Sequence, residues 1–330
     1  MTRGHALPDA PPSLSVGGRW QFGIYRTPAD RVDLPTGGLR RLRLKEWQYV
    51  SFTTDDWYVA VGLVQMGYVG SLFAYVVDRS RGDAAVEYRA LSPLGRSVRV
   101  APSSVRGTTS WKSPAASLSI RANEGWDVDV DVPLGNDRLR GHARIEYQDS
   151  LVMLHPLGSG RVAYTHKAAG CRASGQLTLG ARSIDLGGGL GSSDWTRSQA
   201  DRVTAWKWAS LSGFSSDGAA IGLNLSAEVY DDARGHSVEN ALFVDGDVRS
   251  LSGVRFEVPT NPKTAPWTIR SIDGDEVDLA FQPAGALEER MNFGVVRSDF
   301  VQPYGQFSGH VCGHDVTGCF GVVEKHLSVW

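Results

Sequence analysis

The sequence is built largely from short runs in which apolar and polar residues alternate, each ended by a turn rich in glycine or aspartate. Asp245-Gly246 and Asp273-Gly274 each separate two such runs, and Asp-Gly in this position is a strong signal for a β-hairpin. No stretch sustains the apolar spacing of three and four that an amphipathic helix needs. The pattern therefore predicts many short strands joined by tight turns, with one short helix expected at Ser192–Arg202.

Composition supports the same interpretation. Glycine supplies the positive φ angles of turns, and tryptophan fills wide β cores, and the 330 residues include 38 glycines and 10 tryptophans. A chain of this length holds two β domains more comfortably than one small barrel, and regularly spaced short strands indicate sandwiches or barrels. We predict an all-β fold with a loose leader over residues 1–18, an N-terminal domain over 19–155 and a C-terminal domain over 156–330.

Charge and targeting signals exclude several function classes. The formal net charge of -2 leaves no electrostatic footprint for nucleic acid, and the basic cluster at residues 40–45 alternates with leucine, as expected for the solvated face of a strand. No apolar run is long enough for a membrane span, and the N-terminal sequence MTRGHALPDAPPSL lacks the apolar region of a secretory signal. Three cysteines fit a reducing compartment, so we expect a cytoplasmic protein. Nothing in the sequence indicates its oligomeric state.

The first candidate site lies in the segment Tyr164-Thr165-His166-Lys167. On a strand, Tyr164 and His166 share one face, and Thr165 and Lys167 share the other. The histidine and the lysine could serve as acid or base in an apolar cavity. The alternative is a satisfied polar pair at the rim of a barrel.

A second candidate follows a run of glycines at residues 187–191. The run lacks the Gly-Lys-Ser or Gly-Lys-Thr of a phosphate-binding loop and the last glycine of the dinucleotide pattern, and it lies among strands. We therefore expect neither nucleotide nor any other cofactor. Asp194, beside Trp195, could be a buried acid, or it could be a helix N-cap or a turn residue.

Two further groups of residues lie in the second half of the chain. Trp206 and Trp208 share one strand face and would form a flat apolar wall, suited either to a ligand or to core packing. Asn224, Glu239 and Asn240 lie in apolar surroundings, where buried polar groups must be hydrogen-bonded. These three residues are candidates for ligand contacts and equally for structural roles.

The last segment carries residue types that bind zinc. His310, Cys312 and His314 would share a strand face, with Cys319 opposite across the turn. Their spacing matches no standard metal motif, so we expect no metal site. A bond between Cys312 and Cys319 is disfavoured in a reducing compartment.

The chain carries an ordered series of short motifs. They are Arg43-Leu44-Lys45-Glu46-Trp47, Gly67-Tyr68-Val69-Gly70, His166-Lys167, Trp206-Lys207-Trp208-Ala209, Gly222-Leu223-Asn224-Leu225, Glu239-Asn240, Tyr304-Gly305-Gln306-Phe307-Ser308-Gly309 and Gly321-Val322-Val323-Glu324-Lys325-His326. From about residue 19 to Trp330, this series resembles the bacterial family known as domain of unknown function 2804. That family is in turn similar, more remotely, to tandem lipocalin-like proteins such as carotenoid hydratases of the hydroxyneurosporene synthase type and lipocalin-like pericyclases. The resemblance implies two lipocalin-like β-barrel halves packed in tandem, with a cavity for an apolar molecule, and it implies no established reaction.

We therefore predict that the protein binds a lipid, a polyene or another apolar small molecule in a β-barrel cavity. The alternative is an enzyme acting on such a molecule, a hydratase, isomerase or cyclase in which Asp194, His166 or Glu239 supplies a proton. A structural or interaction module is the third possibility. The predicted ligand contacts are Tyr68, Lys167, Trp195, Trp206, Trp208, Asn224 and Asn240.

Overall fold

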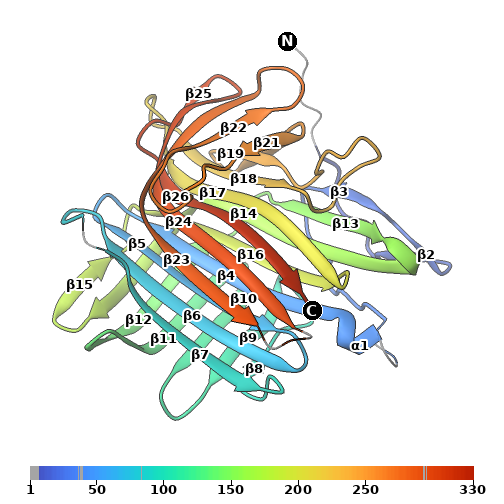
Figure 1. Ribbon diagram of the computed structural model, residues 1–330, viewed down its shortest axis with the longest axis horizontal. Helices are drawn as coiled ribbons and strands as arrows, with labels where there is room; N and C mark the ends of the chain where they lie inside the picture. The colour runs from blue at the N-terminus through green and yellow to red at the C-terminus, as the bar shows by residue number, and fades with distance from the viewer. Residues whose placement is uncertain (1–6, 36, 38–39, 83, 293, 295) are drawn as a thin grey trace. The chain divides into compact units, whose positions relative to one another are not determined.

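The computed structural model describes residues 7–35, 37, 40–82, 84–292, 294 and 296–330, and nearly all of its regular structure is β-strand (Figure 1). Within those ranges the only helical segments are α1 (Arg40–Arg43) and a 3-10 turn at Gly158–Gly160. The predicted all-β fold class is confirmed. The helix predicted at Ser192–Arg202 is wrong, because strand β16 (Leu190–Gln199) occupies that segment.

The chain forms two compact units. The N-terminal unit comprises Pro8–Lys167 and Cys171–Ala200, and the C-terminal unit contains Ala168–Gly170 and Asp201–Trp330. The units therefore divide near residue 200, whereas the expected boundary at residues 155 and 156 falls inside strand β13. Each unit has its own sheet and its own core.

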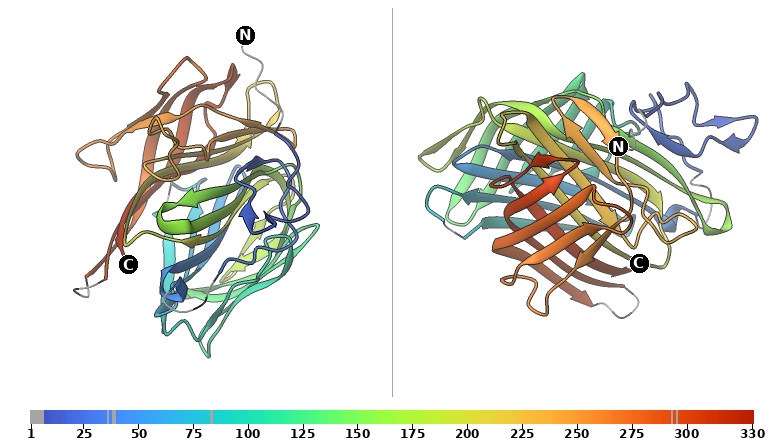
Figure 2. Two further views of the ribbon diagram at one scale, coloured as in Figure 1. Left: turned by 90° about the vertical axis from the view of Figure 1, so that its right-hand side faces the viewer. Right: turned by 90° about the horizontal axis from the view of Figure 1, so that it is seen from above.

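The N-terminal unit is a nearly closed barrel. Its main strands follow the order β7-β6-β5-β4-β16-β14-β12-β11-β10-β9-β8, and β11 comes back against β6 and β7 from the far end of the sheet (Figure 2). The strands are β1 (Ser15–Val16), β2 (Arg19–Trp20), β3 (Gly23–Tyr25), β4 (Leu44–Thr53), β5 (Trp57–Gln65), β6 (Val69–Asp78), β7 (Val86–Pro93), β8 (Val98–Arg99), β9 (Arg106–Lys112), β10 (Ser117–Asn123), β11 (Gly125–Leu134), β12 (Asp137–Glu146), β13 (Leu151–Leu157), β14 (Arg161–Leu179), β15 (Arg182–Asp185) and β16.

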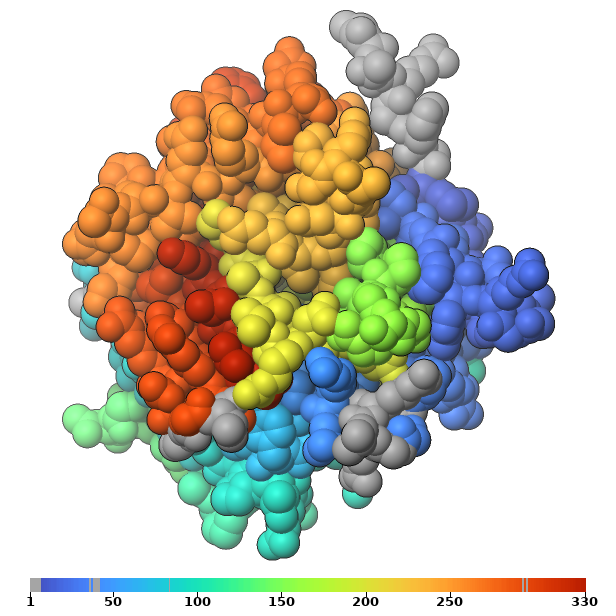
Figure 3. Space-filling model, turned by 45° about the vertical axis from the view of Figure 1, so that its right-hand side comes forward, coloured from blue at the N-terminus to red at the C-terminus, as the bar shows by residue number. Residues whose placement is uncertain are grey.

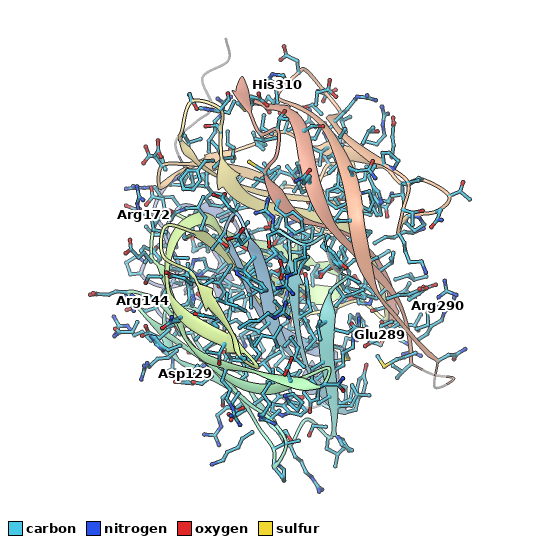
Figure 4. All side chains as sticks on the ribbon, turned by 90° about the vertical axis from the view of Figure 1, so that its left-hand side faces the viewer. Asp129, Arg144, Arg172, Glu289, Arg290 and His310 are labelled. Carbon is cyan, nitrogen blue, oxygen red and sulfur yellow. The ribbon has the colours of Figure 1, made fainter. Side chains whose placement is uncertain are left out.

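Strict alternation on β11 defines the inside and the outside of this barrel. Trp126 and Val128 are buried, whereas the side chain of Asp129 is exposed and lies 2.9 Å from Nδ1 of His142 on β12. Figure 4 shows Asp129 and Arg144 pointing away from the barrel. On β11 the apolar residues therefore face inward, and the charged residues form ion pairs on the outer surface.

The residues before β4 pack onto the same unit. Leu14, Val32 and Leu34 join Tyr164 and Trp195 in one apolar cluster. Strand β13 pairs with β14 and with β3, so the early residues lie beside β13, as the adjoining blue and green surfaces in Figure 3 show. A leader was expected over residues 1–18. Residues 1–6 lie outside the described ranges, and β1 and β2 form a small antiparallel pair.

The C-terminal unit is a half-barrel with the strand order β20-β19-β18-β17-β26-β24-β23-β22-β21. Its apolar core includes Leu211, Leu223, Trp267 and Phe281. The opposite face of β17 and β26 carries the polar and aromatic residues described below. The strands are β17 (Val203–Phe214), β18 (Ala220–Ala227), β19 (Ala241–Val244), β20 (Asp247–Ser250), β21 (Val254–Glu257), β22 (Trp267–Ser271), β23 (Val277–Asn292), β24 (Arg297–Val311), β25 (His314–Asp315) and β26 (Phe320–Val329).

Candidate functional site

His166 lies on the inward face of the N-terminal barrel. Its ring centroid is 5.5 Å from that of Trp126, which belongs to the apolar set of β11, and 6.5 Å from that of Tyr147. The residue is 1% exposed. Neither ring nitrogen has a hydrogen-bond partner within the described part of the chain. An imidazole held in this way is a polar group in an apolar wall.

Burial also fixes the protonation state of this histidine. Desolvation lowers the pKa of His166 to about 3, because a charged imidazolium is poorly solvated in an apolar interior. At neutral pH the ring is therefore uncharged, with one N–H donor and one nitrogen acceptor. His166 is consequently a poor proton donor at neutral pH but a good partner for a neutral hydrogen-bonding group.

Two residues of β16 extend this wall. Tyr164, two positions before His166, places its ring 5.8 Å from the ring of Trp195 in an edge-on contact, and β14 and β16 are neighbours in the sheet. Ser193 shares the face of Trp195 by strand alternation. In the described chain, neither the indole Nε1 of Trp195 nor the Oγ of Ser193 has a hydrogen-bond partner. The structure thus brings His166 and the predicted contact Trp195 to one face.

Lys167 and Asp194 meet on the opposite face of the same two strands. Nζ of Lys167 lies 2.6 Å from Oδ2 of Asp194, and Oδ1 of Asp194 accepts a hydrogen bond from the hydroxyl of Thr196 at 3.2 Å. Both residues are buried. Because the carboxylate is paired with an ammonium group, Asp194 is arranged to accept hydrogen bonds.

Three tyrosines that sequence reasoning missed lie on this second face. The hydroxyls of Tyr49 and Tyr58 are 2.7 Å apart, and the rings of Tyr58 and Tyr75 are 5.9 Å apart. Tyr49 is opposite Asp194 in the register of β4 and β16. Desolvation raises the pKa of all three hydroxyls, so they are neutral at physiological pH. The signal available in the sequence was one tyrosine in each of the three consecutive strands β4, β5 and β6.

Tyr68, a predicted ligand contact, lies against the ammonium group of Lys45. Nζ of Lys45 lies 4.5 Å from the centre of the Tyr68 ring and donates to the carbonyls of Leu42 and Met66 at 3.0 and 3.1 Å. Lys45 is buried, which corrects the solvated strand face predicted for residues 40–45. The cation–π contact and the two carbonyls stabilise the ammonium group at this buried position.

The C-terminal unit holds a polar cluster around Glu324. The indole N–H of Trp206 donates to Oε1 of Glu324 at 2.6 Å, and the amide of Gln302 donates to Oε2 at 2.8 Å. Trp206 and Trp208 are paired in register with His326 and Glu324 across β17 and β26, so the two indoles share one face as predicted from alternation.

His326, which sequence reasoning also missed, is a histidine of the C-terminal unit whose side chain is 12% exposed. Its Nε2 lies 2.8 Å from the hydroxyls of both Ser298 and Ser328, and its ring centre is 4.2 Å from that of Trp206. Desolvation lowers the pKa of His326 to about 3. The signal was present in the strand itself, where the polar residues Glu324, His326 and Ser328 occupy alternate positions.

Asn224 and Asn240 hold backbone and side-chain groups of the same unit. Asn224 accepts a hydrogen bond from the indole of Trp208 and donates to the carbonyl of Glu239, both at 2.8 Å. Asn240 accepts from the N–H of Ser226 at 2.7 Å. The side-chain amides of Asn224 and Asn240 therefore have hydrogen-bond partners within the protein. Glu239 is buried beside these two residues. Roles for these residues in ligand contact stay predictions.

In the described chain, the zinc-binding residue types of the last segment do not form a metal-ligand cluster. Cys312 has a φ of 50° and lies in the turn after β24, which breaks the alternation that would align it with His310 and His314. Cys312 is an unpaired thiol, and Cys319 packs in the apolar core of the C-terminal unit. Across the described ranges, no three His, Cys, Asp or Glu side chains converge as metal ligands would.

Comparisons with known structures identify the fold. A protein of Nitrosomonas europaea assigned as an AttH matches with a TM-score of 0.53 and 11% identity, over 91% of this chain and 97% of that one. CghA, crystallised with Sch210972, matches with a TM-score of 0.51 and 13% identity, over 92% and 94%. Kievitone hydratase from Nectria haematococca matches with a TM-score of 0.43 and 10% identity, over 87% and 88%. The first two agree with the predicted tandem lipocalin-like fold.

The sequence itself places the chain in a family. The model of the family described as domain of unknown function (DUF2804) matches residues 11–330. The chain belongs to this family, which confirms the resemblance seen in its motifs. No curated protein matches it in sequence. Among the described residues there is no helix with the length and apolarity to cross a membrane.

Proposed function

We propose that the N-terminal barrel binds an apolar small molecule against its inward face at His166. The observation that carries this proposal is a fully buried imidazole whose two nitrogens have no partner in the described chain. Leaving a buried polar group unsatisfied costs about 1–3 kcal/mol, so each such group in a native protein calls for an explanation, and a bound molecule is one that fits an apolar wall. A bound molecule with one polar group supplies that partner.

The surrounding wall suits a largely apolar molecule. Val50 and Phe52 on β4 share the inward face with Ser193 by register, and Val59 and Val61 continue it on β5. All of these aliphatic and aromatic side chains are buried. Small antiparallel barrels either fill with side chains or hold one small ligand, and pockets of this kind are mostly apolar with a few placed polar groups.

One structure of the same fold supports the proposal from outside. CghA was crystallised with the compound Sch210972, so a protein of this architecture can accommodate a bound compound. The similarity between the two chains is one of fold, and the proposal for this protein therefore rests on its own residues. The cytoplasmic location expected from the cysteine count also stays a prediction.

The test is native mass spectrometry and organic extraction of the protein purified from its own host. Wild type is expected to retain an apolar molecule and His166→Leu to lose it, because leucine keeps the volume and removes both nitrogens. His142→Leu, on the outer surface of β12, is the matched control and is expected to behave as wild type. Equal retention by His166→Leu, or a wild type that carries and takes up no apolar molecule, would refute the proposal.

A second candidate function is catalysis on such a molecule, as a hydratase, isomerase or cyclase. The observation that favours it is the buried pair of Lys167 and Asp194, 2.6 Å apart. This pair lies on the face opposite His166, so this function requires the substrate to bind on that second face, where the carboxylate could act as an acid or base. Incubating the extracted molecule with protein in deuterated water tests it. Deuterium uptake with wild type and none with Asp194→Asn would support catalysis by proton transfer at this pair, and no uptake with either would exclude such proton transfer.

A further inference from the structure

Three neighbouring side chains on the inward face of the N-terminal barrel have polar atoms without partners in the described chain: His166, Ser193 and Trp195. Ser193 and Trp195 are two positions apart on β16 and therefore share a face. Trp195 contacts the ring of Tyr164, which shares the face of His166 on the adjacent strand. The three residues thus form one patch on one wall, and all three are buried.

The hydrogen-bonding capacity of this patch is mixed. A neutral imidazole offers one donor and one acceptor, an indole offers only a donor, and a serine hydroxyl offers both. A ligand group that only accepts hydrogen bonds would leave the acceptor nitrogen of His166 unsatisfied. A group with no polar atom would leave every polar atom of the patch without a hydrogen bond, and each of these buried atoms would then carry its full desolvation penalty.

The charges on this wall are already balanced. On the inward faces of β4, β16 and the part of β14 before Ala168, the charged residues in the described ranges are Glu46 and Arg197. Nε of Arg197 lies 2.7 Å from Oε1 of Glu46, and its Nη1 donates to the carbonyl of Val32 at 2.8 Å. Lys167 faces the other way and pairs with Asp194. A carboxylate brought to His166 would therefore be buried with no cation available to it.

We infer that the ligand of this barrel is a neutral molecule with a hydroxyl group, which both donates and accepts a hydrogen bond at His166, Ser193 and Trp195. The inference rests on the proposed binding function and narrows its ligand class. It selects apolar alcohols over carboxylic acids of the same chain and over ethers and hydrocarbons.

The experiment measures displacement of the fluorescent probe N-phenyl-1-naphthylamine by three molecules with the same chain: 1-dodecanol, dodecyl methyl ether and dodecanoate at pH 7.5. The alcohol is expected to bind wild type at least about tenfold more tightly than the ether and the acid, the difference that one well-made hydrogen bond gives. Equal affinities for the three molecules, or tighter binding of dodecanoate, would overturn the inference.

Two variants locate the effect. His166→Leu is expected to weaken binding of the alcohol more than binding of the ether, so that the preference for the alcohol is largely lost. Trp195→Phe keeps an aromatic ring, removes the N–H, and is expected to weaken only the alcohol, about fivefold. His142→Leu is again the control. If the probe itself does not bind wild type, the proposed function fails, whereas displacement without preference for the alcohol overturns only the hydroxyl inference.

Discussion

Two histidines with a strongly lowered pKa, His166 in the N-terminal unit and His326 in the C-terminal unit, differ in the hydrogen bonds around their rings. Burial lowers the pKa of both His166 and His326 to about 3, so both rings are neutral at physiological pH. His326 has two serine hydroxyls at 2.8 Å from its Nε2, whereas neither nitrogen of His166 has a partner in the described chain. Desolvation alone therefore does not mark a binding residue, and the hydrogen bonds around each ring distinguish the two.

The indoles repeat this difference. Trp206 donates its N–H to Glu324 and Trp208 donates to Asn224 in the C-terminal unit, while the N–H of Trp195 in the N-terminal barrel has no acceptor within the described residues. The polar face of the C-terminal unit is thus internally bonded. On the inward face at His166 the corresponding polar atoms have no partner in the described chain, and this difference is the observation behind the proposed ligand binding there.

The largest expected effect concerns the residue next to His166. Lys167→Met leaves the buried carboxylate of Asp194 without its ammonium partner, and breaking a buried pair in this way costs about 3–5 kcal/mol. Urea unfolding at pH 7.5 measures the loss. The double variant Lys167→Met with Asp194→Leu is expected to recover much of it, and a single variant as stable as wild type would contradict the geometry of the pair.

Acid is expected to destabilise the protein through both histidines equally. As the pH falls below about 6.5, a histidine in the unfolded chain takes up a proton, but the folded residue does so only near pH 3, so stability present above pH 6.5 is lost progressively toward pH 3. At pH 4.5 each histidine accounts for about 3 kcal/mol. Urea unfolding of wild type, His166→Leu and His326→Leu at pH 7 and 4.5 checks this. In each variant, the loss of unfolding free energy between the two pH values is expected to be smaller than in wild type by about 3 kcal/mol.

At neutral pH the same two substitutions are expected to separate. His326→Leu leaves the hydroxyls of Ser298 and Ser328 without their shared nitrogen and is expected to cost about 2–3 kcal/mol. His166→Leu removes an unsatisfied polar group from an apolar wall, so stability should change by less than about 1 kcal/mol or increase. Equal destabilisation by the two substitutions in urea unfolding would erase the distinction drawn between the rings.

The smallest effect is expected on the outer surface of the barrel. Asp129→Asn removes one exposed partner of His142, and exposed ion pairs contribute little because water screens them. Thermal unfolding should show a change of less than about 0.5 kcal/mol. A loss of stability comparable with that of His326→Leu would mean that the ion pairs on the outer surface contribute substantially to the pairing of the strands.

The fold could be predicted from the sequence because its signals are local. Alternation and Asp-Gly turns specify strands and hairpins, and the face shared by Trp206 and Trp208 follows from period two alone. The helix predicted at residues 192–202 was wrong. Ser, Asp and Thr after a glycine run are compatible with a helix cap, whereas the pairing with β4 and β14 that makes β16 a strand involves distant segments and leaves no local sequence signal.

The site could be predicted only in part, for a related reason. His166, Lys167 and Asp194 are visible as polar residues in apolar runs, but their partners come from distant segments. Glu324 meets Trp206 across 118 positions of sequence, and the buried position of Lys45 depends on Tyr68. Whether a buried histidine is satisfied depends on such contacts, so the difference between His166 and His326 becomes visible only in the folded chain.

The most direct test of the binding claim follows the imidazole nitrogens by NMR. Protein labelled with ¹⁵N-histidine, assigned with His166→Leu and His326→Leu, is titrated with 1-dodecanol and separately with dodecanoate. We predict that at least one of the two ligands shifts the ring nitrogens of His166, with those of His326 unchanged. Saturating ligand that leaves His166 unmoved, or that shifts His326 instead, would contradict the assignment of the binding site to the N-terminal barrel.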